Sequence, residues 1–121
     1  VPDDDAALCR YPIFWIESGM EVRNLLVSNL IRTEAVEGAC PCFFISDGAR
    51  VQHLAVCNAS MVNQAKTPLD FIVNHGTIES LSLLNVHALA EGGAPRGHIL
   101  RGMGTILQQN LSNVVARNLE E

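Results

Sequence analysis

One unit of about 28 residues recurs along the chain, and this repeat constrains the fold more than any other feature. Four glycines mark equivalent points in successive units, with spacings of 29, 28 and 28 residues: Gly19, Gly48, Gly76 and Gly104. A pattern of this length is typical of solenoids, in which each unit packs only on its neighbours. We expect residues 11–121 to form the repeat domain and residues 1–10 to form an N-terminal tail or cap.

Each glycine lies between two segments with the composition of strands. A triplet rich in β-forming apolar residues precedes it, with one lapse at Arg101 in the last unit. The triplets are Phe14-Trp15-Ile16, Phe43-Phe44-Ile45, Phe71-Ile72-Val73 and Ile99-Leu100-Arg101. The segment after the glycine follows the pattern Val51-x-x-Leu54-x-Val56, in which the Leu and Val positions alternate with mostly polar residues. A period of two predicts a strand with one buried face.

Corners, loops and stacking complete the predicted fold. A glycine at each corner is expected to supply the positive φ of a sharp bend. Loops between units are expected at residues 32–39, 63–67 and 89–94. Two strands and a loop cannot enclose a core alone, so the units must stack with like residues above like. The sequence therefore predicts an all-β fold, a right-handed parallel β-helix (β-solenoid) of about four coils.

A column of asparagines follows the second strand of every unit: Asn29, Asn58, Asn85 and Asn113. Asparagine is a poor strand residue, but it tolerates the backbone of a corner. In stacked coils the amide of one side chain can donate to the carbonyl of the next, so the column predicts a hydrogen-bonded ladder. The alternative is four unrelated turn asparagines.

Composition and charge narrow the class of partner. Of the 121 residues, 48% are hydrophobic and 17% are charged, which favours a packed domain over disorder. The formal net charge of −5 and the scattered Lys and Arg residues argue against nucleic-acid binding. No apolar run is long enough for a membrane span. The four cysteines are too few for a disulfide scaffold and lack the spacing of a zinc site, so we expect free thiols and no metal or cofactor.

The pattern of triplet, glycine, Val/Ile-x-x-Leu-x-Val/Leu-x-Asn, as in residues 71–85, resembles the right-handed parallel β-helix (pectin-lyase-like) superfamily. That superfamily includes polysaccharide lyases, polygalacturonase-like glycosidases and phage tailspikes. The resemblance covers nearly the whole chain and implies a polysaccharide partner and an extracellular or cell-surface location. Members usually have more coils, so adjoining coils of a parent chain or further subunits are expected to cover the open ends.

Catalytic roles are not carried over from this resemblance, and the catalytic residues remain unknown. Polygalacturonase-like enzymes use clustered aspartates with a His-Gly pair nearby. His75-Gly76 matches that pair, but no adjacent aspartates lie inside the repeats, and Asp3-Asp4-Asp5 lies outside them. A glycosidase needs two carboxylates around the scissile bond.

Polar residues nevertheless align when the units are superposed on their glycines. One column contains Glu17, Ser46 and Asn74, and the next contains Ser18, Asp47 and His75. Rungs lie about 4.8 Å apart, so Asp47 and His75 are expected to meet and to bind sugar hydroxyls or transfer protons. Asp70 and His98, each six residues before a glycine, form a second candidate pair. The alternative for all of these corner residues is simple solvation.

Two functional hypotheses follow. The first is a module of a larger extracellular or surface protein that binds or helps process polysaccharide, without a complete active site in this segment. An enzymatic role, if present, would be that of a polysaccharide-active glycosidase or lyase. The second is a non-catalytic structural or oligomerisation module, with a second copy or the parent chain as its partner.

Overall fold

The structure is a computed structural model that describes residues 12–35, 38, 40–91 and 97–117. The predicted tail or cap at residues 1–10 lies outside the described residues. The described chain is all-β, and its strands are β1 (Phe14–Ile16), β2 (Glu21–Ser28), β3 (Ile31–Glu34), β4 (Phe43–Ile45), β5 (Arg50–Asn63), β6 (Ile72–Asn74), β7 (Thr77–Ala90), β8 (Leu100–Arg101) and β9 (Thr105–Arg117).

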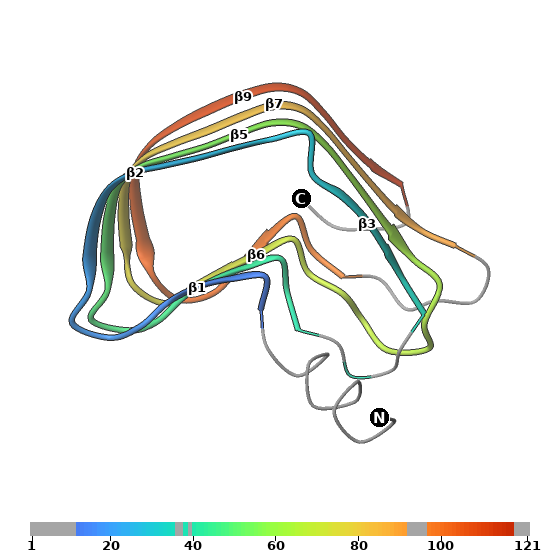
Figure 1. Ribbon diagram of the computed structural model, residues 1–121, viewed down its shortest axis with the longest axis horizontal. Coiled ribbons are helices and arrows are strands. Elements are labelled where there is room, and N and C mark those ends of the chain that lie inside the picture. Colours follow the sequence, from blue (N-terminus) through green and yellow to red (C-terminus); the bar gives the residue numbers. More distant parts are fainter. Residues whose placement is uncertain (1–11, 36–37, 39, 92–96, 118–121) are drawn as a thin grey trace.

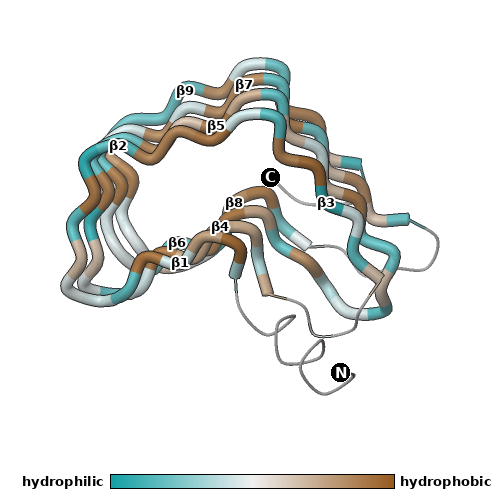
Figure 2. Tube along the Cα trace, viewed as in Figure 1, coloured by the Kyte–Doolittle hydropathy of each residue, from teal (hydrophilic) through white to brown (hydrophobic). Residues whose placement is uncertain are grey.

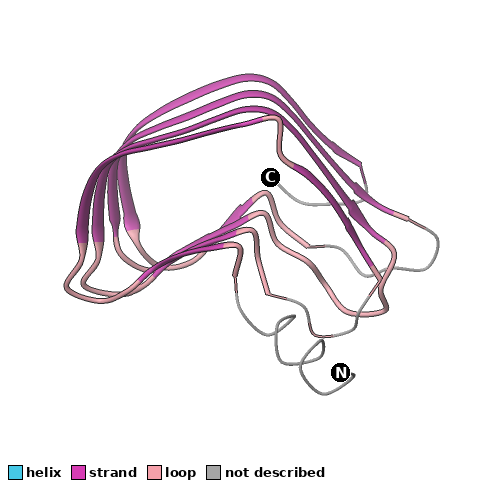
Figure 3. Cartoon of the chain, viewed as in Figure 1, coloured by secondary structure: helices cyan, strands magenta, loops and turns pink. Residues whose placement is uncertain are grey.

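The strands form two parallel sheets, and in each sheet the strands of successive rungs stack along a common axis (Figures 1 and 3). The triplet sheet has the order β1-β4-β6-β8, and the long sheet has the order β2-β5-β7-β9, with β3 also paired to β5. Each rung contains one triplet strand and the long strand that follows it; β3 belongs to the first rung. The result is a right-handed parallel β-solenoid of about three turns, close to the four coils that the repeat predicts.

Apolar columns fill the inside of the solenoid. Val51, Leu54 and Val56 of β5 are each at most 1% exposed, and they lie in register with Ile78, Leu81 and Leu83 of β7. The residues between them are half-buried, and Figure 2 shows bands of apolar and polar residues that repeat from rung to rung. The Val-x-x-Leu-x-Val pattern of the sequence therefore marks the core correctly.

Each long strand bends at its asparagine. Asn29, Asn58, Asn85 and Asn113 all have positive φ, between 53° and 59°, a conformation that asparagine tolerates better than most residues. Asn85 Nδ2 donates to Asn58 Oδ1 at 3.1 Å, and Asn113 Nδ2 donates to Asn85 Oδ1 at 2.7 Å. The bend and these bonds let one strand continue around a corner without losing contact with its neighbours.

A third strand segment lies beyond this bend, where the sequence predicts loops. β3 occupies residues 31–34 and β7 continues to Ala90, so loops beginning at residues 32 and 89 were wrong. The missed signal is a second alternation after each asparagine: Ala59, Met61 and Asn63 are buried, whereas the residues between them are half-buried.

The corner glycines are of two kinds, which corrects the expectation that all four have positive φ. Gly19 and Gly48 have φ of 84° and lie in four-residue turns, closed by hydrogen bonds from Met20 N to Glu17 O and from Ala49 N to Ser46 O. The third and last turns are two residues shorter, because Asn74 pairs with Ile45 and Thr77 with Arg50. Gly76 and Gly104 lie in these short turns without positive φ.

Close packing explains the short-turn glycines. A Cβ on Gly76 would lie 2.5 Å from both Ala49 O and Ser46 O, and one on Gly104 would overlap Gly76 O. These glycines are therefore required by the approach of neighbouring rungs and not by a left-handed backbone.

We expect Asn85→Gly to destabilise the protein by about 2 kcal/mol, since it keeps the positive φ but removes two side-chain hydrogen bonds worth about 1 kcal/mol each. The measurement is the free energy of unfolding in urea. Asn29→Gly is the matched control: Asn29 has the same backbone conformation, and its side chain makes no ladder bond within the described residues. Equal losses for the two variants would show that the ladder contributes nothing.

Candidate functional site

The outer face of the triplet sheet carries one column of large side chains. Trp15, Phe44, Val73 and Arg101 are in register on successive rungs. Their neighbours Phe43, Ile45 and Ile72 point into the core. Trp15 is 45% exposed, and its indole Nε1 donates to Ser46 Oγ of the next rung at 3.1 Å. The column thus presents an accessible aromatic ring and, at its far end, an exposed guanidinium.

Asp70 organises a polar cluster beside this column. Its Oδ1 accepts the backbone N–H of His98 at 2.8 Å and lies 3.4 Å from His98 Nδ1. Its Oδ2 accepts from Arg101 Nε at 2.8 Å. The Asp70 side chain is 11% exposed, whereas those of His98 and Arg101 are 33% and 54% exposed. The buried carboxylate therefore holds two accessible groups in place.

The Asp70 cluster borders a shallow groove of about 470 Å³ at the start of the triplet strands. Its other described lining residues are Gly38, Pro41, Thr67 and Pro68. The sequence prediction that Asp70 and His98 lie close together agrees with this geometry. Superposition of the repeat units on their glycines did not identify Arg101, which stood out only as a charged exception in an apolar triplet. The charge at that position was the signal that could have identified it as a site residue.

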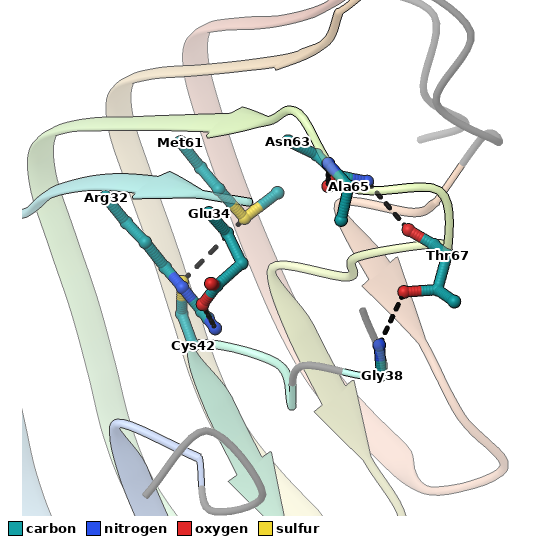
Figure 4. A network of polar contacts seen from close by, with 8 residues as sticks. All are labelled: Arg32, Glu34, Gly38, Cys42, Met61, Asn63, Ala65 and Thr67. Atoms are coloured by element: carbon teal, nitrogen blue, oxygen red, sulfur yellow. Dashed lines mark hydrogen bonds and ion pairs between the residues drawn. The ribbon is translucent and has the colours of Figure 1, made fainter. Parts of the chain in front are cut away.

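Hydrogen bonds fix the loop that carries Asp70 (Figure 4). Buried Asn63 receives a bond from Ala65 N and donates to Thr67 O, both at 2.9 Å. Thr67 Oγ1 then accepts from Gly38 N at 2.7 Å, which ties together the loops of two consecutive rungs. These bonds hold the loop backbone in place. The groove therefore has a fixed lining, although loops and not strands form this part of it.

The other predicted pair, Asp47 and His75, is arranged differently from the expectation. Main-chain bonds from Ser46 N to Ile16 O and from His75 N to Ile45 O place His75 in the column of Ser46, not of Asp47. The cause is the two-residue shortening of the third turn, which glycine alignment cannot detect. No hydrogen bond or ion pair joins the Asp47 and His75 side chains, both of which are among the described residues.

His75 lies at the end of the triplet strands. Its ring contacts Phe44 edge to face, with centroids 5.6 Å apart, and its Nδ1 accepts from Met103 N at 3.5 Å. Asp47 and His75 both line a second groove of about 480 Å³, where the long turn of the second rung meets the short turns after it. Glu17 is exposed in the first turn and is not among the described lining residues of either groove.

An inward-facing ion pair, which the sequence pattern does not predict, closes part of the first rung. Arg32 donates to Glu34 at 2.9 Å and to Cys42 Sγ at 3.4 Å, and Cys42 Sγ lies 3.8 Å from Met61 Sδ (Figure 4). Arg32 is in register with buried Met61. Burial raises the pKa of the Cys42 thiol, and the nearby guanidinium only partly opposes this. Cys42 is therefore a packing residue, held neutral.

The chemistry available at the two grooves is hydrogen bonding to a ligand. Cys42 and Cys57 are free thiols, and within the described residues no three His, Cys, Asp or Glu side chains form a cluster suited to a metal ion. One carboxylate, Asp70, appears among the described lining residues of the first groove, and Asp47 alone among those of the second. Among these described lining residues, neither groove therefore contains the two carboxylates that a glycosidase places around the scissile bond.

Comparison with known proteins adds no relative: no protein-family profile, curated protein or solved structure matches the chain. In the part of the chain that the structure describes, no helix has the length and apolar character of a membrane span.

Proposed function

We propose that this chain is a polysaccharide-binding module of pectin-lyase-like type, part of an extracellular or cell-surface protein, and that it binds without cleaving. The observation that carries the proposal is the outer face of the triplet sheet, where exposed Trp15 lies in line with Phe44 and Arg101. Aromatic rings offer apolar area with a defined orientation, which suits the C–H faces of sugar rings.

Grooves at both ends of the triplet strands supply the polar groups. Arg101 donates one N–H to Asp70 and keeps its remaining donors for a ligand, while His98 is partly accessible beside it. His75 and Asp47 line the opposite groove. Sugar hydroxyls both donate and accept hydrogen bonds, so a mixed set of cationic, neutral and anionic groups fits them. An extended chain that crosses the triplet sheet would meet both of these sets.

Binding of soluble polysaccharides to the immobilised chain tests the proposal, with neutral and acidic polymers compared. Trp15→Ala is expected to weaken binding about tenfold or more, the loss of one buried aromatic contact. His98→Ala is expected to weaken it less. Leu84→Ala is the matched control, because Leu84 is 44% exposed on the long sheet, away from the site. Absence of binding by the native chain, or native affinity in Trp15→Ala, would contradict the proposal.

A structural or assembly role is the second candidate. It is favoured by the end strands, since β9 is paired on one side only, by β7, and β2 and β3 are each paired only with β5. Unpaired strand edges are templates for association. This role is compatible with polysaccharide binding, because it uses the ends of the solenoid and not the triplet face.

A further inference from the structure

We infer that the last rung of one molecule stacks on the first rung of a second copy, head to tail, so that the solenoid continues across the interface. The inference goes beyond polysaccharide binding and is independent of it. It concerns the surface formed by β8 and β9 at one end and the surface formed by β1, β2 and β3 at the other.

The apolar columns are incompletely covered at both ends. Leu111 is 48% exposed, although the residues in its column on the inner rungs, Leu83 and Val56, are each 1% exposed. Val27 continues the same column on the first rung and is half-buried. Extending the register by one rung places Leu111 of one copy against Val27 of the next, which buries both.

Other columns also bring apolar residues together when the register is extended by one rung. Ile106 would face Val22, and Val114 would face Leu30, with an apolar residue on each side. These four residues pack against the core but remain partly exposed. Asn113 would meet Asn29 and add one member to the asparagine ladder, since both have the backbone conformation of the inner asparagines. The second copy therefore supplies an apolar partner in three columns, whereas Gln109 would face Leu25 in a fourth.

Charge also favours this occupant. Residues 97–117, which contain the last rung, include Arg101 and Arg117 and no carboxylate. Residues 12–35, which contain the first rung, have three glutamates against two arginines. Two identical ends would lack this complementarity, which favours head-to-tail contact over a symmetric dimer.

Such a contact is heterologous and does not close, so it produces linear oligomers whose length depends on concentration. Sedimentation of the full chain should show a weight-average mass that rises with concentration. Leu111→Lys places a charge in the interface and should weaken association at least tenfold. Leu84→Lys, with a similarly exposed leucine on an inner rung, should associate like the native chain. A native chain that remains monomeric throughout would overturn the inference.

Disulfide trapping gives the direction of stacking and does not depend on Leu111→Lys folding. Leu26 and Asn110 face outward in one column whose other members, Ala55 and Ser82, are not cysteines. Across the proposed interface their Cα atoms would be about 5 Å apart, within disulfide range. A mixture of Leu26→Cys and Asn110→Cys should form mixed disulfides on oxidation, beyond any background given by the native cysteines. Cross-linking of Leu26→Cys with itself, or none in the mixture, would refute head-to-tail stacking.

Polysaccharide binding separates this inference from the proposed function. Leu111→Lys should retain native affinity for any polysaccharide that binds, because Leu111 lies on the long sheet. Loss of self-association with binding intact supports stacking alone. Loss of binding in the same variant, with the fold preserved, would contradict the independence of the two surfaces.

Discussion

Phe43→Ala is expected to destabilise the protein by about 3 to 5 kcal/mol, the range for removing a large aromatic side chain from a packed core. Phe43 is fully buried in the second rung. Its ring stacks on Phe14 with centroids 4.9 Å apart and meets Phe71 edge to face at 5.5 Å, so one truncation removes contacts with two neighbouring rungs. Urea unfolding followed by circular dichroism measures the change.

Two control variants test whether the loss of stability comes from removing a buried apolar side chain. Phe43→Leu retains most of the apolar volume and should cost less than Phe43→Ala. Leu26→Ala, at a side chain that is 67% exposed, should change stability by less than about 0.5 kcal/mol. A similar small loss for Phe43→Ala and Leu26→Ala would show that the aromatic stack does not hold the rungs together.

Gly76→Ala is expected to be more damaging than Gly19→Ala, although the sequence presents both as corner glycines. The new Cβ at position 76 would press on two backbone oxygens and on Ile45 Cγ2 at 2.9 Å, and backbone cannot rotate away as a side chain can. We expect a loss of about 3 kcal/mol or more, or failure to fold, which is the upper range for overpacking.

Gly19→Ala has open space around the new Cβ, and its cost comes from the positive φ alone. That cost is about 1 to 2 kcal/mol. Thermal and urea unfolding of the two variants rank them. If Gly19→Ala proved the more damaging, close approach of the rungs at Gly76 would not be the reason for that glycine.

The fold was predictable because stacked parallel rungs impose the same chemistry at the same place in every unit. Alternating residues such as Leu54 and Val56 identify the buried face directly. The segment after Asn58 was missed because asparagine is usually a terminator, whereas here a single left-handed residue bends the strand without ending it. Hydrogen bonding with the neighbouring rungs outweighs the low strand propensity of asparagine.

The candidate site was predictable only where spacing alone determines proximity. Asp70 and His98 are 28 residues apart and lie on adjacent rungs, so counting was enough. His75 was placed in the wrong column because counting from glycines assumes turns of constant length. Trp15 was read as a strand former, since a triplet of three apolar residues does not reveal which one faces outward.

The turns join the triplet sheet to the long sheet, and their lengths differ without disturbing the register of either sheet. In Figure 3 the first two turns extend beyond the later ones, and the second groove lies at this step. Shape at that edge is consequently set by the length of each turn, whereas Gly76 and Gly104 are fixed by the close approach of the neighbouring rungs. Insertions or deletions there could remodel the contour of the surface while the scaffold stays unchanged, which makes this edge the natural place to engineer new recognition.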